Sequence, residues 1–214
     1  MTPPTVSAFK WVPPFAQGLV RDLRVRWALE EASTAYDLRL LAMGENGSEE
    51  YRHLQPFGQV PSYEEGDLVL FESGAIVLHI AEHCEGLLSI DLNTRARTIS
   101  WMFAALNTVE VPVTMLNQID RFNPATAEFR ESVIEAVRRR LSSLATTLGD
   151  ADYLEGGFSA ADLLMVSVLR ILRDTELVGE HPNLVSYQQR CEARDTFQRA
   201  LGAQMATFNQ NVPA

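Results

Sequence analysis

Short apolar runs separated by turn residues fill the first part of the chain. Their spacing predicts short strands and amphipathic helices, and the order of these elements is βαβαββα. The strands are expected at residues 6–12, 36–41, 59–63 and 68–71, and the helices at residues 19–32, 49–54 and 72–82. Because a βαβ unit crosses over right-handedly, the pattern predicts a mixed α/β domain.

From about residue 92 onward, apolar residues recur at helical spacing and no further strand pattern follows. Helices are predicted at residues 92–108, 113–122, 125–148, 159–173, 182–193 and 196–207. Pro112 is expected to end the first of them. The change of pattern predicts a boundary within residues 87–93, with an α/β domain over residues 1–86 and an all-α domain over residues 93–214.

A helix-capping pattern opens the most apolar of these helices. Ser159 is a good N-cap residue, and Asp162 stands three residues later, where its carboxylate can reach back to the N-cap N–H. Phe158 and Leu163 flank this pair at the positions of a hydrophobic staple. The predicted role is structural, with this helix at the centre of the second domain.

Composition excludes several classes of partner. A net charge of −10 over 214 residues argues against nucleic acid and anionic membranes, which both select basic patches. No signal sequence and no apolar run of membrane-spanning length is evident, and Cys84 and Cys191 lie far apart, so a reduced, cytoplasmic protein is expected. Although His79 and His83 are four residues apart, the histidines form no metal-ligand spacing, and no metal is expected.

The most informative stretch runs from Pro56 to Glu82. In Gly58-Gln59-Val60-Pro61, a proline inside an apolar segment implies an edge strand or a break, often with a cis bond. The turn residues 64–67 and the run 68–71 then predict a hairpin. Glu72-Ser73-Gly74 opens a helix, whose first N–H groups and dipole favour a carboxylate ligand.

These two motifs at this separation resemble the thioredoxin-like domain of glutathione S-transferases. The resemblance extends to the Ser159–Asp162 helix start and to the Pro182 helix, and so over nearly the whole chain. It implies a thioredoxin-like α/β N-terminal domain followed by an all-α helical-bundle C-terminal domain. It also implies glutathione as co-substrate, with the residue before the cis-proline binding the cysteinyl part and the Glu-Ser pair binding the γ-glutamyl end. The implied glutathione-binding residues are Gln59, Val60, Pro61, Glu72 and Ser73.

The usual thiolate-stabilising hydroxyl of that family is missing. Family members place a Tyr, Ser or Cys just after the first strand, whereas Ala8 to Ala32 contains no Ser, Thr, Tyr or Cys. Lowering the pKa of the glutathione thiol must then fall to other groups. In order of preference we expect the N–H groups of the helix starting near Leu19, the amide of Gln17 and the charge of Arg21. Gln17 could equally be a plain loop residue, and Arg21 a solvated one.

The resemblance also implies a second-substrate pocket and a dimer. The pocket residues are expected on the first loop and on the first helix of the all-α domain, although aromatic residues at such spacing are also typical of a core. They are Trp11, Phe15, Trp101, Phe103 and Asn107. Phe57 stands where some family members insert an aromatic side chain into a partner subunit; the alternative is packing within its own domain.

Two functions from different classes remain open. The first is a glutathione transferase-like enzyme of detoxification, a homodimer whose bound thiolate attacks an apolar electrophile or reduces a disulfide or peroxide. The second is a scaffold of the same fold that binds glutathione without turnover, which the missing hydroxyl favours. A redox protein that uses its own thiols is excluded, because the first loop contains no cysteine.

Overall fold

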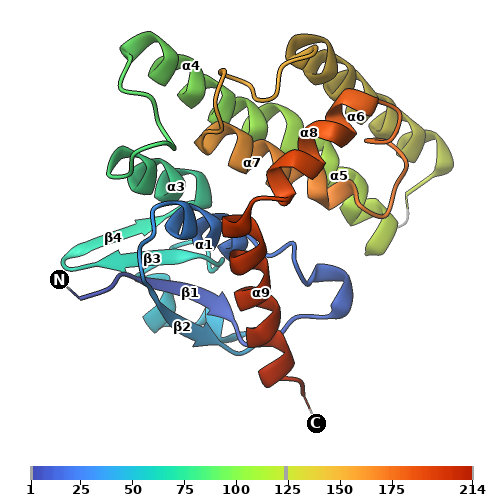
Figure 1. Ribbon diagram of the computed structural model, residues 1–214. Coiled ribbons are helices and arrows are strands. Elements are labelled where there is room, and N and C mark those ends of the chain that lie inside the picture. Colours follow the sequence, from blue (N-terminus) through green and yellow to red (C-terminus); the bar gives the residue numbers. More distant parts are fainter. Residues whose placement is uncertain (1, 123–124, 214) are drawn as a thin grey trace. The chain divides into compact units, whose positions relative to one another are not determined.

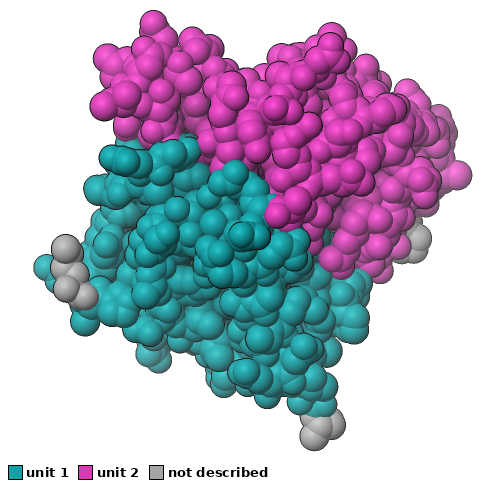
Figure 2. All heavy atoms as spheres, in the orientation of Figure 1, with its two compact units in different colours: residues 1–87, 194–214 teal, residues 88–193 magenta. Residues whose placement is uncertain are grey.

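The computed structural model describes residues 2–122 and 125–213. It forms two compact units, one of Met1–Leu87 with Arg194–Ala214 and one of Leu88–Ala193 (Figures 1 and 2). The last helix, which the sequence analysis assigned to the C-terminal domain, thus lies in the unit of the sheet. The division between the two units after Leu87 falls within the stretch where the sequence pattern changes.

The first unit is built on a four-stranded sheet in the order β2-β1-β3-β4. Its strands are β1 (Thr5–Phe9), β2 (Asp37–Leu41), β3 (Ser62–Glu65) and β4 (Leu68–Phe71). β1 pairs in parallel with β2 and antiparallel with β3, and β3 pairs antiparallel with β4. With the helices α1 (Asp22–Glu31), α2 (Glu49–Arg52) and α3 (Ser73–Glu82), the order is βαβαββα, which confirms the predicted thioredoxin-like domain.

Alternation along β1 separates two layers of side chains. Val6 and Ala8 are buried on one face of the sheet, whereas Phe9 packs on the other face in a small cluster with Tyr51 and Val60. Ser7 shares the face of Phe9 by the same alternation. A polar residue in the middle of β1 is therefore turned toward α2.

α1 starts later than the sequence pattern predicts. Residues 17–21 form turns, in which the Leu19 N–H donates to the Ala16 carbonyl at 3.0 Å, and the α-helix begins only at Asp22. The prediction of a helix start near Leu19 is therefore wrong. Pro13 and Pro14 open a 3-10 turn in this loop, and this turn delays the helix.

α9 (Asp195–Gln210) packs along α1 within the first unit. At one end, the Glu31 carboxylate accepts two hydrogen bonds from Arg194, both at 2.7 Å, and a further one from the Trp27 indole at 3.0 Å. Trp27 also contacts Phe197 edge to face, with ring centroids 4.8 Å apart. Burial alone raises the pKa of Glu31, but the hydrogen bonds from Arg194 and the Thr196 hydroxyl outweigh it and hold the pKa below its ordinary value.

The described residues of the second unit form helices and no strand, apart from one isolated bridge between Glu155 and Gly157. It contains α4 (Leu92–Phe103), the π-helix η3 (Ala104–Val109), α5 (Glu110–Arg121), α6 (Ala127–Leu148), α7 (Ala160–Leu169), the 3-10 turn η4 (Arg170–Leu172) and α8 (Pro182–Glu192). Pro112 does not end a helix, contrary to the prediction. It lies in the first turn of α5, directly after the π-helix, where the Glu110 N–H donates to Ala105 five residues back.

α7 forms the core of the second unit and contacts α4, η3 and α8. The predicted capping box is present: the Ser159 N–H donates to the Asp162 carboxylate at 2.9 Å. Asp162 is fully buried and also accepts from the Tyr187 hydroxyl at 2.9 Å. Burial raises the pKa of Asp162, against the opposing effect of these hydrogen bonds. The motif has the structural role that the sequence indicated.

The continuous helix Leu92–Arg121 corrects a further expectation. By length and composition alone it is long and apolar enough to cross a membrane, whereas no apolar run of that length was expected. Met102, Val113 and Leu116 on this helix are buried within the protein. Since the core helix of a folded unit passes the same test, the apolar character of this segment is weak support for a membrane span.

Candidate active site

The β3–β4 hairpin brings the two sequence motifs to one end of the sheet. In the antiparallel register, Ser62 at the start of β3 pairs with Phe71 at the end of β4. Pro61 and Glu72 are the next residues beyond this pair. The loop before β3 and the start of α3 are therefore neighbours, although eleven positions separate them in the numbering.

The loop before β3 is held by side chains close to it in the sequence. The Val60–Pro61 bond is cis, as the position of the proline suggested. Gln55 is buried, and its side-chain oxygen accepts from the N–H groups of Phe57 at 2.7 Å and Gln59 at 3.1 Å. These bonds fix the backbone ahead of the proline. The strand itself begins at Ser62, three residues later than the predicted segment.

Gly58 is required by both conformation and space. Its φ is +63°, in the left-handed region that favours glycine, and a Cβ at this position would lie 2.8 Å from the Asn46 carbonyl oxygen. Asn46 in turn donates its side-chain amide to the Gly58 carbonyl at 2.6 Å. The loop and the segment before α2 thus fit together with no room for a side chain.

Glu72 and Ser73 occupy the start of α3 with different environments. Glu72 is the N-cap residue, is exposed, and has a φ of +67°, which is uncommon for any residue other than glycine. Ser73 is buried, and its hydroxyl accepts a hydrogen bond from the Arg24 guanidinium at 3.2 Å. The backbone at the start of α3 thus holds the Glu72 side chain at the surface, and the hydrogen bond from Arg24 fixes the Ser73 hydroxyl in the interior.

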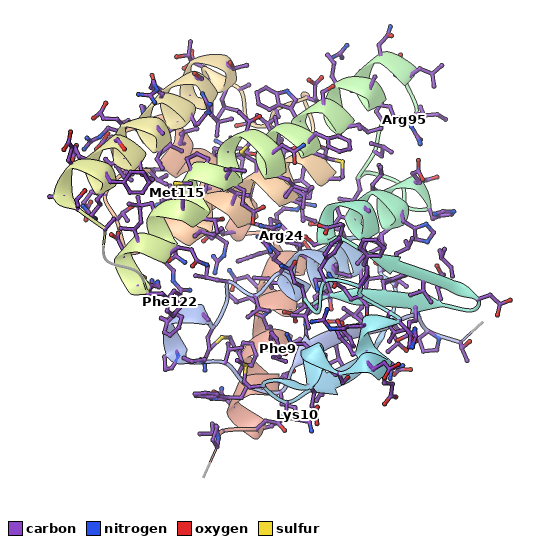
Figure 3. All side chains as sticks on the ribbon, turned by 180° about the vertical axis from the view of Figure 1, so that it is seen from behind. Phe9, Lys10, Arg24, Arg95, Met115 and Phe122 are labelled. Carbon is purple, nitrogen blue, oxygen red and sulfur yellow. The ribbon has the colours of Figure 1, made fainter. Side chains whose placement is uncertain are left out.

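Arg24 is a site residue that the sequence analysis missed. It lies on α1 (Figure 3). Its exposed fraction is only 4%. No signal in the sequence distinguished it from the other arginines of the predicted helix, because burial of a charge requires partners that the sequence does not show. Through Ser73, Arg24 links α1 to the start of α3.

The β1–α1 loop leaves the same end of the sheet, because β1 runs antiparallel to β3. Gln17 donates its side-chain amide to the Val12 carbonyl at 3.0 Å, within the loop. Arg21 is the N-cap residue of α1. The N–H groups of Leu23 and Arg24 donate to Val20 and Arg21 at 3.0 and 3.1 Å, so fewer N–H groups are left at this helix start than an ordinary α-helix offers.

A buried ion pair lies at the same helix start. The Asp22 carboxylate accepts from Arg26 at 2.7 Å, and both side chains are 1% exposed. Burial raises the pKa of Asp22, while Arg26 and the Gln204 side chain act in the opposite direction. Gln204, on α9, donates to Asp22 at 2.7 Å and to the Val20 carbonyl at 3.2 Å. α9 therefore contacts the start of α1 directly.

The predicted second-substrate residues are divided between the two units. Trp11 and Phe15 lie in the β1–α1 loop, and Phe15 is 37% exposed. Trp101 and Phe103 are two positions apart on α4, about 200° around the helix, so their side chains leave it on different faces. Asn107 is exposed on the π-helix, a feature frequent at functional sites. That these five residues form one pocket stays a prediction.

Phe57 and the histidines have surroundings of their own. Phe57 is 66% exposed, and its ring lies 6.1 Å from that of Phe71 in the same unit. His79 is 3.0 Å from the Glu65 carboxylate, and this hydrogen bond holds the pKa of Glu65 below its ordinary value. Among the residues that the structure describes, no group of three His, Cys, Asp or Glu side chains could hold a metal ion.

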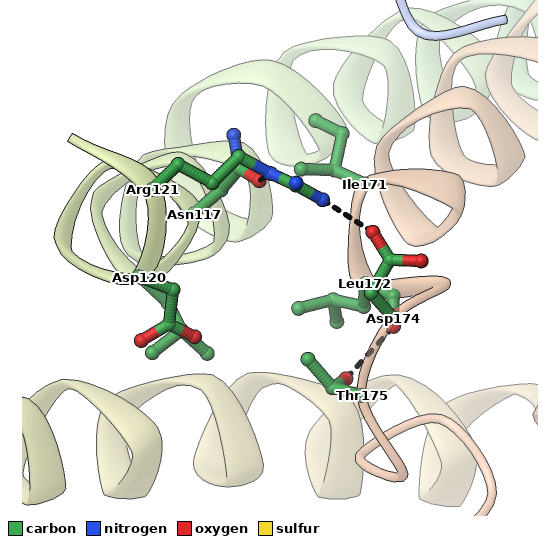
Figure 4. Close-up of a pocket in the computed structure, with 8 residues that line it drawn as sticks. Asn117, Asp120, Arg121, Ile171, Leu172, Asp174 and Thr175 are labelled. Carbon is green, nitrogen blue, oxygen red and sulfur yellow. Dashed lines mark hydrogen bonds and ion pairs between the residues drawn. The ribbon is translucent and has the colours of Figure 1, made fainter. Parts of the chain in front are cut away.

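A pocket of about 310 Å³ lies wholly in the second unit, between α5 and the segment after α7 (Figure 4). Arg121 there pairs with Asp174 and also donates to Asn117 at 2.7 Å. None of the residues predicted for the site lines this pocket; its lining consists of Leu116, Asn117, Asp120, Arg121, Ile171, Leu172, Asp174 and Thr175.

The fold and this end of the sheet define a class of protein: a thioredoxin-like domain with a cis-proline loop, followed by a helical unit. Residues 16–82 match the family model described as glutathione S-transferase, N-terminal domain, and residues 110–195 match the corresponding C-terminal domain. The chain belongs to the glutathione S-transferase family. The predicted family, fold and class of enzyme, glutathione transferase-like, are confirmed.

Individual relatives agree with this assignment. The chain is 30% identical over 208 residues to glutathione S-transferase 4 of Zea mays, with 91% of each chain covered. Its fold is similar to glutathione transferase F7 from Populus trichocarpa, with a TM-score of 0.82, 22% identity, and 94% and 99% of the two chains covered. It is also similar to a Pseudomonas putida glutathione transferase solved with glutathione disulfide bound, with a TM-score of 0.82, 20% identity, and 93% and 90% covered.

Proposed function

We propose that this protein binds glutathione at the end of the sheet formed by the cis-proline loop and the start of α3. One observation carries the proposal: the Ser62–Phe71 pair of the hairpin brings Pro61 and Glu72 together. The bound thiolate then attacks an apolar electrophile, or reduces a disulfide or peroxide. The family assignment supports this reading, because its members are glutathione transferases by name.

The proposed binding roles follow from the groups available. The backbone around Gln59, Val60 and Pro61 pairs with the cysteinyl part, as a strand edge pairs with an extended peptide. Within the described part of the chain, no group accepts from the Val60 N–H, which supports this role. Glu72 and Ser73 bind the charged γ-glutamyl end at the start of α3.

Thiolate stabilisation is assigned to the β1–α1 loop. Residues 8–32 contain no hydroxyl or thiol side chain, so the start of α1, Gln17 and Arg21 are the proposed contributors, in that order. The competing function is a glutathione-binding scaffold without turnover, and the same absence favours it. The two functions differ in whether the bound thiol is ionised.

Ultraviolet titration of the thiolate in the complex tests the proposal. An enzyme should hold glutathione largely as thiolate near pH 7, whereas a scaffold should bind it with a thiol pKa near the ordinary value of about 8.5. Calorimetry on Glu72→Ala should show binding weakened by about tenfold or more, with Glu50→Ala on α2 as the control. Unchanged affinity of Glu72→Ala would refute this placement.

We further propose a cytoplasmic homodimer, active in detoxification, with Phe57 at the dimer contact. The exposed Phe57 ring, next to the partly exposed ring of Phe71, supports an apolar contact surface. The second substrate is assigned to a pocket of Trp11, Phe15, Trp101, Phe103 and Asn107. Light scattering on Phe57→Asp should show a monomer, and a dimer of unaltered mass would exclude Phe57 from the contact.

A further inference from the structure

We infer that three buried hydroxyl groups, those of Ser7, Tyr51 and Ser62, fix the orientation of the Gln59–Val60 peptide and thereby present the Val60 N–H to a ligand. Tyr51 is thus a positioning residue for the cis-proline loop. The inference rests on the proposed function in one respect, namely that glutathione is the ligand that uses this N–H.

The hydroxyl groups form a continuous chain. The Tyr51 hydroxyl lies 2.7 Å from the Gln59 carbonyl oxygen and 2.6 Å from the Ser7 hydroxyl. The Ser7 oxygen lies 2.6 Å from the Ser62 backbone nitrogen and 3.0 Å from the Ser62 hydroxyl. The chain therefore ties the residues on both sides of Val60–Pro61 to β1 and α2.

The direction of every bond in this chain is determined. A carbonyl oxygen can only accept, so the Tyr51 hydroxyl donates to Gln59. Having used its one proton, Tyr51 must accept from Ser7. Ser7 in turn accepts from the Ser62 N–H and hydroxyl. Each hydroxyl donates once, and no two donors oppose each other.

The chain of hydroxyl groups determines the direction of the Val60 N–H through the geometry of the Gln59–Val60 peptide. The Gln59–Val60 bond is trans, since Val60–Pro61 is the cis bond among the described residues. In a planar trans peptide, the C=O and the N–H point in opposite directions. Because Tyr51 holds the Gln59 carbonyl toward the interior, the Val60 N–H is directed away from Tyr51.

Burial strengthens the hydrogen bonds between these hydroxyl groups. Ser7, Tyr51 and Ser62 are 1%, 3% and 0% exposed, so water does not compete for their hydrogen bonds. α2 is only four residues long, and its N-cap Ser48 accepts from the Tyr51 N–H at 3.2 Å. The short helix thus places Tyr51 under the loop, and removal of its hydroxyl would leave the Gln59 carbonyl without its donor.

The test compares Tyr51→Phe with Tyr63→Phe. Tyr63 is a matched control, because it is equally buried in the same unit but donates to Glu65, away from the cis-proline loop. In the ligand-free protein, carbon-13 NMR of the Gln59 carbonyl should move in Tyr51→Phe and stay in place in Tyr63→Phe. Calorimetry should show glutathione binding weakened by about tenfold in Tyr51→Phe only.

A second variant covers the case in which Tyr51→Phe does not fold. Ser7→Ala removes the donor to Tyr51 and should move the Gln59 carbonyl resonance in the same direction by a smaller amount. In a folded double variant, the two effects should be less than additive, since both substitutions break one chain.

The outcomes separate this inference from the proposed function. An unmoved Gln59 resonance in Tyr51→Phe, or in Ser7→Ala where only that variant folds, would overturn the inference. So would a moved resonance with unchanged glutathione affinity, since the peptide would then not serve this ligand. If the unmodified protein binds no glutathione, the proposed function is refuted, and the NMR comparison still decides whether the hydroxyl chain orients the peptide.

Discussion

Two loops meet at one end of the sheet, and they are held in different ways. The cis-proline loop is fixed by Asn46, Gln55 and Tyr51, all within thirteen positions of Gln59. The β1–α1 loop is instead tied at Val20 and Asp22 to Gln204 of α9, more than 180 positions away in the chain. The cis-proline loop is thus held largely by residues near it in the sequence, with further support from Ser7 of β1. The part proposed to activate the thiol depends in addition on the last helix.

This difference separates binding from activation. A change in the cis-proline loop should affect glutathione affinity directly, because its hydrogen bonds present the binding groups. A change in α9 should leave that loop intact and act on the start of α1. The family assignment decides neither point, since the match to the N-terminal domain, residues 16–82, includes both the cis-proline loop and the start of α1.

The largest effect is expected for Gly58→Ala. The alanine would have to adopt a left-handed φ of +63°. Its Cβ would lie 2.8 Å from the Asn46 carbonyl oxygen, which belongs to the backbone and cannot move alone. The free energy of unfolding should fall by about 3 kcal/mol, and glutathione affinity should fall with it. Urea unfolding and calorimetry measure the two quantities.

Gly66→Ala supplies the control for this substitution. Gly66 has a similar φ of +58°, but no atom lies within 4 Å of its would-be Cβ. Only the conformational penalty of about 1 kcal/mol should remain. Equal losses in the two variants would mean that the contact with Asn46 does not fix the loop.

The next effect is expected for Glu31→Gln, which weakens the attachment of α9. Glu31 is 8% exposed and accepts from Arg194, Thr196 and Trp27, so the substitution should lower the free energy of unfolding by about 2 kcal/mol. Glu30→Gln is the control, since the partner of Glu30, Arg199, is 55% exposed, and a loss of about 0.5 kcal/mol is expected.

The Glu31 effect should also depend on pH. The pKa of Glu31 is lower in the folded protein than its ordinary value of 4.5, so the unfolded chain binds the proton more readily. The stabilising contribution is therefore complete above pH 4.5 and is lost as the pH falls through the folded-state pKa. Urea unfolding at several pH values should show the difference between the unmodified protein and Glu31→Gln shrinking below pH 4.5. A constant difference would contradict the assigned pKa direction.

Local motifs could be predicted from the sequence, whereas contacts between distant parts of the chain could not. The β3–β4 hairpin, the cis-proline and the Glu72–Ser73 helix start are local motifs, and short-range turn and strand patterns were sufficient to find them. The start of α1 was placed three residues too early, because the turns after Pro13–Pro14 contain the same apolar residues as a helix.

The supporting residues were beyond reach of the sequence alone. The partner of Arg24, Ser73, lies 49 positions away and becomes visible only when the helix is placed on the sheet. Asp22 and Arg26 are four residues apart on one helix, but nothing in the sequence shows that this pair is buried. Ser7, which stands between Val6 and Ala8 in β1, shows its role only once Tyr51 of α2 is placed beside it. The packing of α9 on α1 is a contact between the two ends of the chain, and local periodicity carries no information about it.

Apart from the control variants, the smallest effect on stability is expected for Gln204→Leu, which also gives the most direct test of the difference between the two loops. The variant keeps the size of a buried side chain but removes its hydrogen bonds to Val20 and Asp22, at a cost of about 1 kcal/mol in the free energy of unfolding. Because the cis-proline loop is untouched, glutathione affinity should change by no more than about twofold.

The ionisation of bound glutathione should nevertheless respond to this variant. Loss of the tie to Gln204 frees the start of α1 and leaves Asp22 with Arg26, so the N–H groups and charges there lose their fixed arrangement. The thiol pKa measured by ultraviolet titration should rise in Gln204→Leu and stay unchanged in Gln210→Leu, whose side chain is exposed on the same helix. A pKa unaffected by either substitution would show that the activating loop is as locally determined as the binding loop, and the distinction between the two would be lost.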